Sequence, residues 1–101
     1  MKLYVLNVRW LQEERVFERF LECVGAERRD KALAYRFAKD RALSLGVGLL
    51  LNMALRREAP QMPIPDQFRH GEFGKPYFDG EGAPAFCLSH SGEYAVCAIG
   101  G

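Results

Sequence analysis

The uncharged stretch ALSLGVGLLLNMAL, residues 42–55, decides which fold this chain can adopt. Because it is shorter than the roughly 20 residues that a helix needs to cross a bilayer, it predicts a buried helix and no membrane span. A helix over 40–57 gathers five apolar residues on one face: Leu43, Val47, Leu50, Leu51 and Ala54. Gly46 and Gly48 lie inside this helix, each at a cost of about 1 kcal/mol relative to alanine. We therefore expect another backbone to pack closely at these glycines.

The segments before this helix predict one strand and two further helices. A strand is expected over 2–9, because Leu3 to Leu6 favour β-structure. A helix is expected over 11–24, where apolar residues recur at helical spacing, with Gly25 ending it in the left-handed conformation. A second helix is expected over 27–38.

After these helices the sequence favours turns and short strands instead of helical structure. Pro60, Pro63 and Pro65 end helical structure and make an extended connection. Short runs and turns follow, with strands expected over 85–88 and 94–99 and a tight turn at Ser91-Gly92. The order predicts an α+β fold: an N-terminal strand, three helices, a long loop and a small antiparallel sheet in a single lobe.

Length and composition exclude several classes of protein. A chain of 101 residues makes one small domain with a thin core. Its 49% hydrophobic and 27% charged residues exclude a disordered chain, and a net charge of +1 gives no field for binding nucleic acid. The three cysteines, without C-x-x-C spacing, indicate reduced thiols in a cytoplasmic protein. The N-terminus becomes charged too early for a signal peptide.

Arg28 and Lys31 are the first candidates for ligand binding. They are three residues apart and therefore share a helix face, which we expect to be the first turn of the helix over 27–38. An anion bound there would offset the unfavourable position of two cations near a helix N-terminus. A solvated basic face explains the same pattern.

Two further motifs lie in the second half of the chain. GEFGKP, residues 71–76, has two residues between its glycines and so is not a nucleoside-triphosphate P-loop; it is either a ligand-binding turn or a surface turn. LSHSG, residues 88–92, places Ser89 and His90 next to each other on a strand, where they cannot face each other as a nucleophile and its base. A hydroxyl beside a histidine suits phosphate binding, while a structural histidine in a polar turn is the alternative. No metal site is expected, because no pair of carboxylates follows a strand.

In chain order these elements resemble the N-terminal half of the surfactin-type 4′-phosphopantetheinyl transferases. These enzymes move the phosphopantetheine arm of coenzyme A onto a carrier-protein serine. The resemblance runs from Met1 to the last residue, and its most specific parts are residues 74–76 and 88–92. It implies coenzyme A as substrate and assigns eight residues to its binding. The residues that it assigns to the 3′-phosphate are Arg28, Lys31 and Ser44. Those that it assigns to the adenine and ribose are Gly74, Lys75 and Pro76. Those that it assigns to the other phosphates of coenzyme A are Ser89 and His90.

The same resemblance implies that part of the enzyme is missing. Family enzymes have two similar lobes, and their Mg²⁺-binding and catalytic residues follow the position that matches Ile99. We therefore expect 1–101 to be an N-terminal lobe without the C-terminal catalytic lobe, holding no catalytic residue and inactive alone. Mg²⁺ is expected only where that missing half is supplied.

The implied partners are an acyl or peptidyl carrier protein and either a C-terminal lobe or a second copy of the chain, since an isolated lobe exposes apolar surface. No nucleic acid or membrane partner is expected. Two alternatives stay open: a non-catalytic module that binds coenzyme A or a nucleotide or docks a carrier protein, and a structural domain without a ligand.

Overall fold

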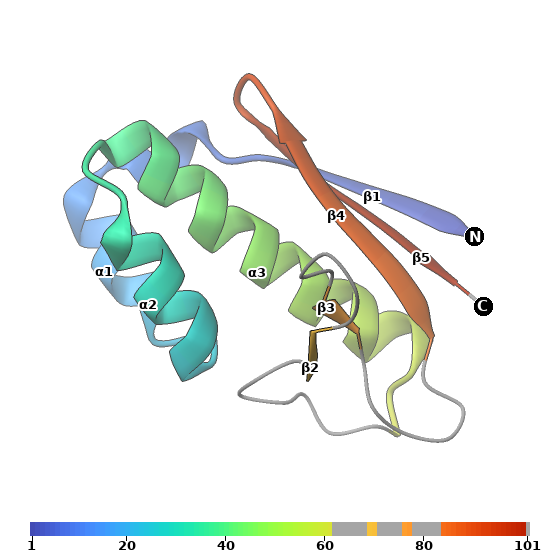
Figure 1. The fold of residues 1–101 in the computed structure, drawn as a ribbon. Helices are drawn as coiled ribbons and strands as arrows, with labels where there is room; N and C mark the ends of the chain where they lie inside the picture. Colours follow the sequence, from blue (N-terminus) through green and yellow to red (C-terminus); the bar gives the residue numbers. More distant parts are fainter. Residues whose placement is uncertain (62–68, 71–75, 78–83, 101) are drawn as a thin grey trace.

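Helix α3 (Ala38–Glu58) forms the centre of the computed structural model (Figure 1). The structure describes residues 1–61, 69–70, 76–77 and 84–100. On one side α3 contacts the main sheet, and on the other it contacts the helices that precede it. The apolar face predicted from Leu43 to Ala54 is buried throughout. The predicted core helix is therefore confirmed, although it begins two residues earlier and ends one residue later than expected.

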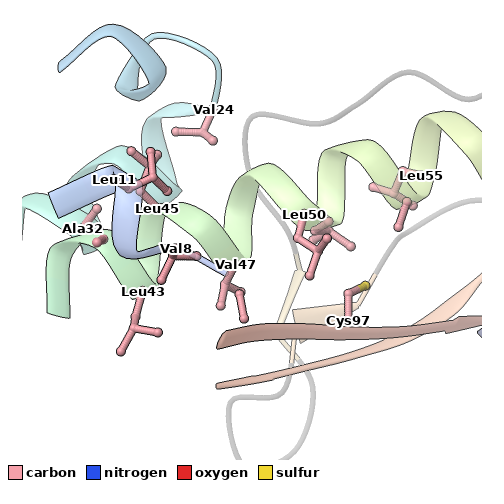
Figure 2. Packing of buried hydrophobic residues seen from close by; sticks show 14 of the residues in the cluster. Val8, Leu11, Val24, Ala32, Leu43, Leu45, Val47, Leu50, Leu55 and Cys97 are labelled. Atoms are coloured by element: carbon pink, nitrogen blue, oxygen red, sulfur yellow. The ribbon is translucent and has the colours of Figure 1, made fainter. Parts of the chain in front are cut away.

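The main sheet has the strand order β1-β5-β4 and is antiparallel throughout. Strand β1 (Lys2–Asn7) pairs with β5 (Tyr94–Gly100), which in turn pairs with β4 (Ala85–Ser91). Lys2 lies opposite Ile99, so the two ends of the chain are side by side (Figure 1). Figure 2 shows Cys97 of β5 pointing from the sheet toward α3. Strands β2 (Arg69–His70) and β3 (Pro76–Tyr77) make a separate two-stranded sheet, and the α+β fold class is confirmed.

The N-terminal segment is divided more finely than its sequence predicts. Strand β1 ends at Asn7, whose side-chain oxygen accepts a 2.9 Å hydrogen bond from the Arg9 backbone and starts a turn. A 3-10 helix, η1 (Arg9–Gln12), follows, and α1 (Glu14–Leu21) begins after Glu13. The Glu13 carboxylate caps α1 by accepting from the backbone N–H groups of the second and third helical residues. The single helix expected over 11–24 was therefore wrong in both boundaries.

The prediction for Gly25 was also wrong. Its φ of −71° and ψ of 168° are extended, and it caps the start of α2 (Ala26–Ala34). Helix α2 ends at Ala34, four residues before the predicted end, because Tyr35 turns to an extended conformation. Arg41 in the first turns of α3 fixes this connection: its Nε donates to the Tyr35 carbonyl at 2.6 Å, and its Nη2 donates to the Leu33 carbonyl at 3.5 Å.

Side chains, and not another backbone, occupy the space beside the two glycines of α3. A Cβ atom on Gly46 would lie 3.1 Å from Cβ of Val8 and 3.5 Å from Cδ1 of Leu11. A Cβ atom on Gly48 would collide with the Arg28 side chain. Figure 2 shows Val8 and Leu11 beside α3. The expected close approach is therefore present, but the expectation of a neighbouring backbone was wrong.

A two-residue turn at Gly92-Glu93 connects β4 and β5, one position later than predicted. Gly92 has a φ of +60°, which glycine adopts without a steric penalty. The predicted strands over 85–88 and 94–99 are confirmed within longer ones. The long loop expected after Pro60 falls mostly on 62–68, 71–75 and 78–83, outside the described residues. In the described ranges, no helix is long and apolar enough to span a bilayer.

Candidate functional site

A cavity of about 280 Å³ lies where α2, α3 and the hairpin end of β4 meet. Residues from all three elements line it. Its polar residues are Arg28 and Lys31 from α2, Asp40 and Ser44 from α3, and Ser89 and His90 from β4. Its other residues are Tyr35, Leu43, Val47 and Leu88. A concave site with an apolar floor and several converging polar groups is the usual form of a ligand site.

Helical periodicity explains how α3 contributes to this cavity. Its lining residues are Asp40, Leu43, Ser44 and Val47, which follow the i, i+3, i+4, i+7 spacing of one helix face. Leu43 and Val47 are buried and hold this face against the core. Ser44 and Asp40, at the edge of the same face, are half-buried and reach the cavity. The burial of the apolar residues thus positions the polar ones.

The structure brings together five of the eight residues singled out in the sequence. Around the one cavity lie Arg28, Lys31, Ser44, Ser89 and His90. Gly74 and Lys75 lie outside the described residues, and only the backbone of Pro76 is described, paired with His70. The ligand role of all eight stays a prediction.

The position of the basic pair on its helix differs from the expectation. Arg28 is the third residue of α2, but Lys31 lies in the last turn, where the helix dipole favours a cation. The cavity is therefore lined by residues of both the first and the last turn of α2. The expectation that both cations lie in the first turn was wrong, because Lys31 is the sixth residue of α2 and a helical turn holds about 3.6 residues.

Charge in the cavity favours an anionic ligand. Arg28 is half-buried, and this burial lowers the pKa of its guanidinium, while the nearby charge of Glu27 acts in the opposite direction. A guanidinium stays charged in proteins, so burial leaves a cation that gains from a bound anion. Lys31 is exposed and adds a second cation, against the single carboxylate of Asp40. Phosphate is one of the two anionic groups, with carboxylate, that arginine binds through paired hydrogen bonds.

Ser89 and His90 both reach the cavity although they are consecutive strand residues. β4 is an edge strand, and both residues are exposed close to its turn. Across the described part of the chain, no hydrogen bond joins the Ser89 hydroxyl to the His90 ring. The pair therefore lacks the contact that a serine nucleophile and its base require, while phosphate binding by these two residues stays a prediction.

Two cavity residues with polar atoms were not identified from the sequence. Tyr35 lies seven residues after Arg28, and Asp40 lies four before Ser44. Asp40 lies one helical turn before Ser44 on the same face of α3, so extending the helical repeat from Ser44 would have found it. Tyr35 is the extended residue that follows α2, and helical spacing gives no signal for it.

The described residues that line the cavity offer one carboxylate and do not by themselves form a group of metal ligands. Asp40 is the only carboxylate among the described residues that line it. In the ranges that the structure describes, no three side chains of His, Cys, Asp or Glu are grouped so that they could hold a metal ion. Magnesium binds through oxygen ligands in octahedral geometry, usually with one or two carboxylates and substrate phosphates.

A second cavity, of about 450 Å³, lies between η1, α1 and α3. Trp10 and Phe20 line it with their rings nearly perpendicular and their centroids 5.1 Å apart. The Asn52 amide, also in its wall, donates to the Cys23 carbonyl at 3.2 Å. None of the residues singled out in the sequence lines this cavity among the described ones.

The family and the relatives that this chain resembles are consistent with the anion-binding chemistry of the cavity. The model of a family described as "4'-phosphopantetheinyl transferase, N-terminal" matches residues 8–100. A 4'-phosphopantetheinyl transferase of Bacillus subtilis is 30% identical over 82 residues, which are 81% of this chain and 37% of that protein. The 4'-phosphopantetheinyl transferase Sfp of Bacillus subtilis strain 168 is 26% identical over 99 residues, 98% of this chain and 44% of that protein. The chain thus spans less than half the length of these relatives.

Proposed function

The chain belongs to the N-terminal 4'-phosphopantetheinyl transferase family, and from that premise we propose that its cavity binds the phosphorylated nucleotide end of coenzyme A. Coenzyme A is here the substrate of the phosphopantetheinyl transfer, and the acceptor is a serine of an acyl or peptidyl carrier protein. A cytoplasmic location is part of the proposal and is supported by three free cysteines.

The meeting of polar residues from two helices and one strand at a single cavity carries this proposal. Arg28, Lys31 and Ser44 come from two helices and supply two cations and a hydroxyl, which suit the 3′-phosphate. Ser89 and His90 come from a strand that lines the same cavity and suit the pyrophosphate. Gly74, Lys75 and Pro76 are proposed to border the adenine and ribose.

Calorimetric titration of the chain with coenzyme A and with dephospho-coenzyme A tests the proposal. We expect coenzyme A to bind more tightly by more than about 1 kcal/mol, because Arg28 and Lys31 lose a charged partner when the 3′-phosphate is absent. Equal affinity for the two compounds would contradict the 3′-phosphate assignment. Binding of neither compound would favour a structural domain without a ligand.

We further propose that the chain alone does not catalyse transfer. Phosphoryl transfer depends on a metal that neutralises charge and on a positioned base, and the described residues include no group of three side chains that could hold a metal ion. Transfer of phosphopantetheine to a carrier protein by the purified 101-residue chain with Mg²⁺ would overturn this proposal. A non-catalytic module that binds coenzyme A or a nucleotide, or docks a carrier protein, is the second candidate, favoured by the same donor set.

The uncovered face of the main sheet supports pairing with a C-terminal lobe or a second copy. Leu3 and Val5 of β1 are 67% and 55% exposed, and Tyr94 of β5 is 49% exposed. Apolar side chains grouped on an exposed face mark interaction surfaces in small proteins. We expect the isolated chain to be a dimer in light scattering at tens of micromolar. A monomeric mass at that concentration would contradict self-association.

A further inference from the structure

Gly48 of α3 lies directly beneath the side chain of Arg28. A Cβ atom at position 48 would lie 2.9 Å from Cδ and 3.3 Å from Nε of Arg28, and closer still to its Cγ. Any residue larger than glycine at this position would therefore displace the stem that carries the guanidinium. Glycine lowers helix propensity more than any residue except proline, so its place in the middle of a 21-residue helix needs a local reason.

The contact also explains how an arginine of α2 is fixed at the wall of a cavity shared with α3. The stem of Arg28 lies across the backbone of α3 at Gly48, and Arg28 is half-buried there. A long side chain that is held along its stem loses little conformational freedom when its head binds a ligand. Arg28 and Ser44 line the same cavity, and Gly48 lies one helical turn beyond Ser44.

We propose that Gly48 is a positioning residue that holds Arg28 against α3 and so places its guanidinium for the 3′-phosphate of the ligand. The ligand in this inference rests on the proposed function; the coupling between Gly48 and Arg28 does not. A merely structural role for Gly48 would change stability alone, whereas positioning changes the preference for a ligand that carries the 3′-phosphate.

Four variants of the full chain separate these roles: Gly48→Ala, Arg28→Ala, the double variant, and Gly46→Ala as the matched control. A Cβ atom at position 46 would meet Val8 and Leu11, and Gly46 is not among the described residues that line this cavity, so its replacement tests the same change elsewhere in α3. Calorimetry measures the affinity for coenzyme A and for dephospho-coenzyme A, and thermal denaturation measures stability.

We expect Gly48→Ala to weaken the affinity for coenzyme A by about tenfold or more. The affinity for dephospho-coenzyme A should change by less than about twofold. Gly46→Ala should leave the ratio of the two affinities unchanged, whatever it does to stability. In the Arg28→Ala background, Gly48→Ala should leave coenzyme A binding unchanged and raise the melting temperature, because the space is then free and alanine favours the helix. In the wild-type background the same change should not raise it.

Retention of the wild-type affinity ratio by a folded Gly48→Ala protein would overturn the inference. If that variant does not fold, the double variant decides: recovery of folding supports the inference, and failure to recover contradicts it. If the wild-type chain binds neither compound, the proposed function fails, and the thermal cycle alone then decides whether Gly48 and Arg28 are coupled.

Discussion

The hydroxyl of Tyr4 in β1 donates a hydrogen bond of 2.5 Å to Oε2 of Glu58, the last residue of α3. Lys2 forms an ion pair with the same carboxylate, and its Nζ lies 3.4 Å from Oε1 of Glu58. These contacts join the first strand to the far end of the core helix. The hydrogen bond from Tyr4 lowers the pKa of Glu58, and the same bond raises the pKa of Tyr4.

Stability should therefore depend on pH through this pair. A carboxyl with a lowered folded-state pKa contributes stability above its unfolded pKa, and this contribution is lost as pH falls through the folded pKa. A tyrosine with a raised pKa contributes stability below its unfolded pKa, and this is lost as pH rises through the folded value. We expect Tyr4→Phe to lower the melting temperature most at neutral pH and least in acid and strong alkali. Tyr94→Phe is the control, and a Tyr4→Phe effect that is constant across pH would contradict the assignment.

The three thiols should differ in reactivity. Cys97 is fully buried beneath α3 and burial raises its pKa to about 11, while Cys23 and Cys87 are exposed. Because the thiolate is the reactive form, a thiol reagent at mildly alkaline pH should label two cysteines in the folded chain and the third only after denaturation. A register slip of one residue in β5 would turn Cys97 outward, so rapid labelling of Cys97 would contradict the sheet register.

Lys31→Ala should selectively weaken binding of a ligand with a 3′-phosphate. We expect a loss of about 1 kcal/mol for coenzyme A, smaller at high salt because Lys31 is exposed, and less loss for dephospho-coenzyme A. Lys39→Ala removes an exposed cation of α3 that does not line the cavity among the described residues. Equal effects of the two substitutions would show that only the general charge of this segment matters.

His90→Ala should weaken the binding of coenzyme A and of dephospho-coenzyme A by a similar factor. Both carry the pyrophosphate to which this residue is assigned, and a hydrogen bond to a charged group contributes about 1.5–3 kcal/mol. Ser91→Ala, at the next position of β4, is the matched control because Ser91 is exposed and is not a cavity residue. A loss confined to coenzyme A would place His90 at the 3′-phosphate instead.

The core elements were predictable because their apolar residues are continuous or regularly spaced. Residues 42–55 place apolar side chains at helical spacing and predict α3, and residues 94–99 are a short run of apolar residues that predicts β5. Helix boundaries were predicted less well. Glu13 caps α1 and Arg41 fixes the end of α2 through side-chain hydrogen bonds to the backbone, and neither residue is a usual boundary signal.

Each residue of the candidate site could be singled out from the sequence, but the fold topology decides which of these residues lie together. The β4–β5 hairpin, in which β5 also pairs with β1, places Ser89 and His90 beside cavity residues of α2 and α3 that lie over 40 residues earlier in the chain. The role of Gly48 could not be inferred either, because its contact with Arg28 joins two helices and follows no sequence period.

Titration of the isotopically labelled chain with coenzyme A, followed by two-dimensional NMR, tests most directly whether the cavity between α2, α3 and β4 receives the nucleotide. We predict that the largest shift changes fall on the amides around Arg28, Lys31, Ser44, Ser89 and His90 and saturate together. Shift changes centred on Trp10, Phe20 and Met53, which line the second cavity, would contradict the account, as would no change at saturating coenzyme A.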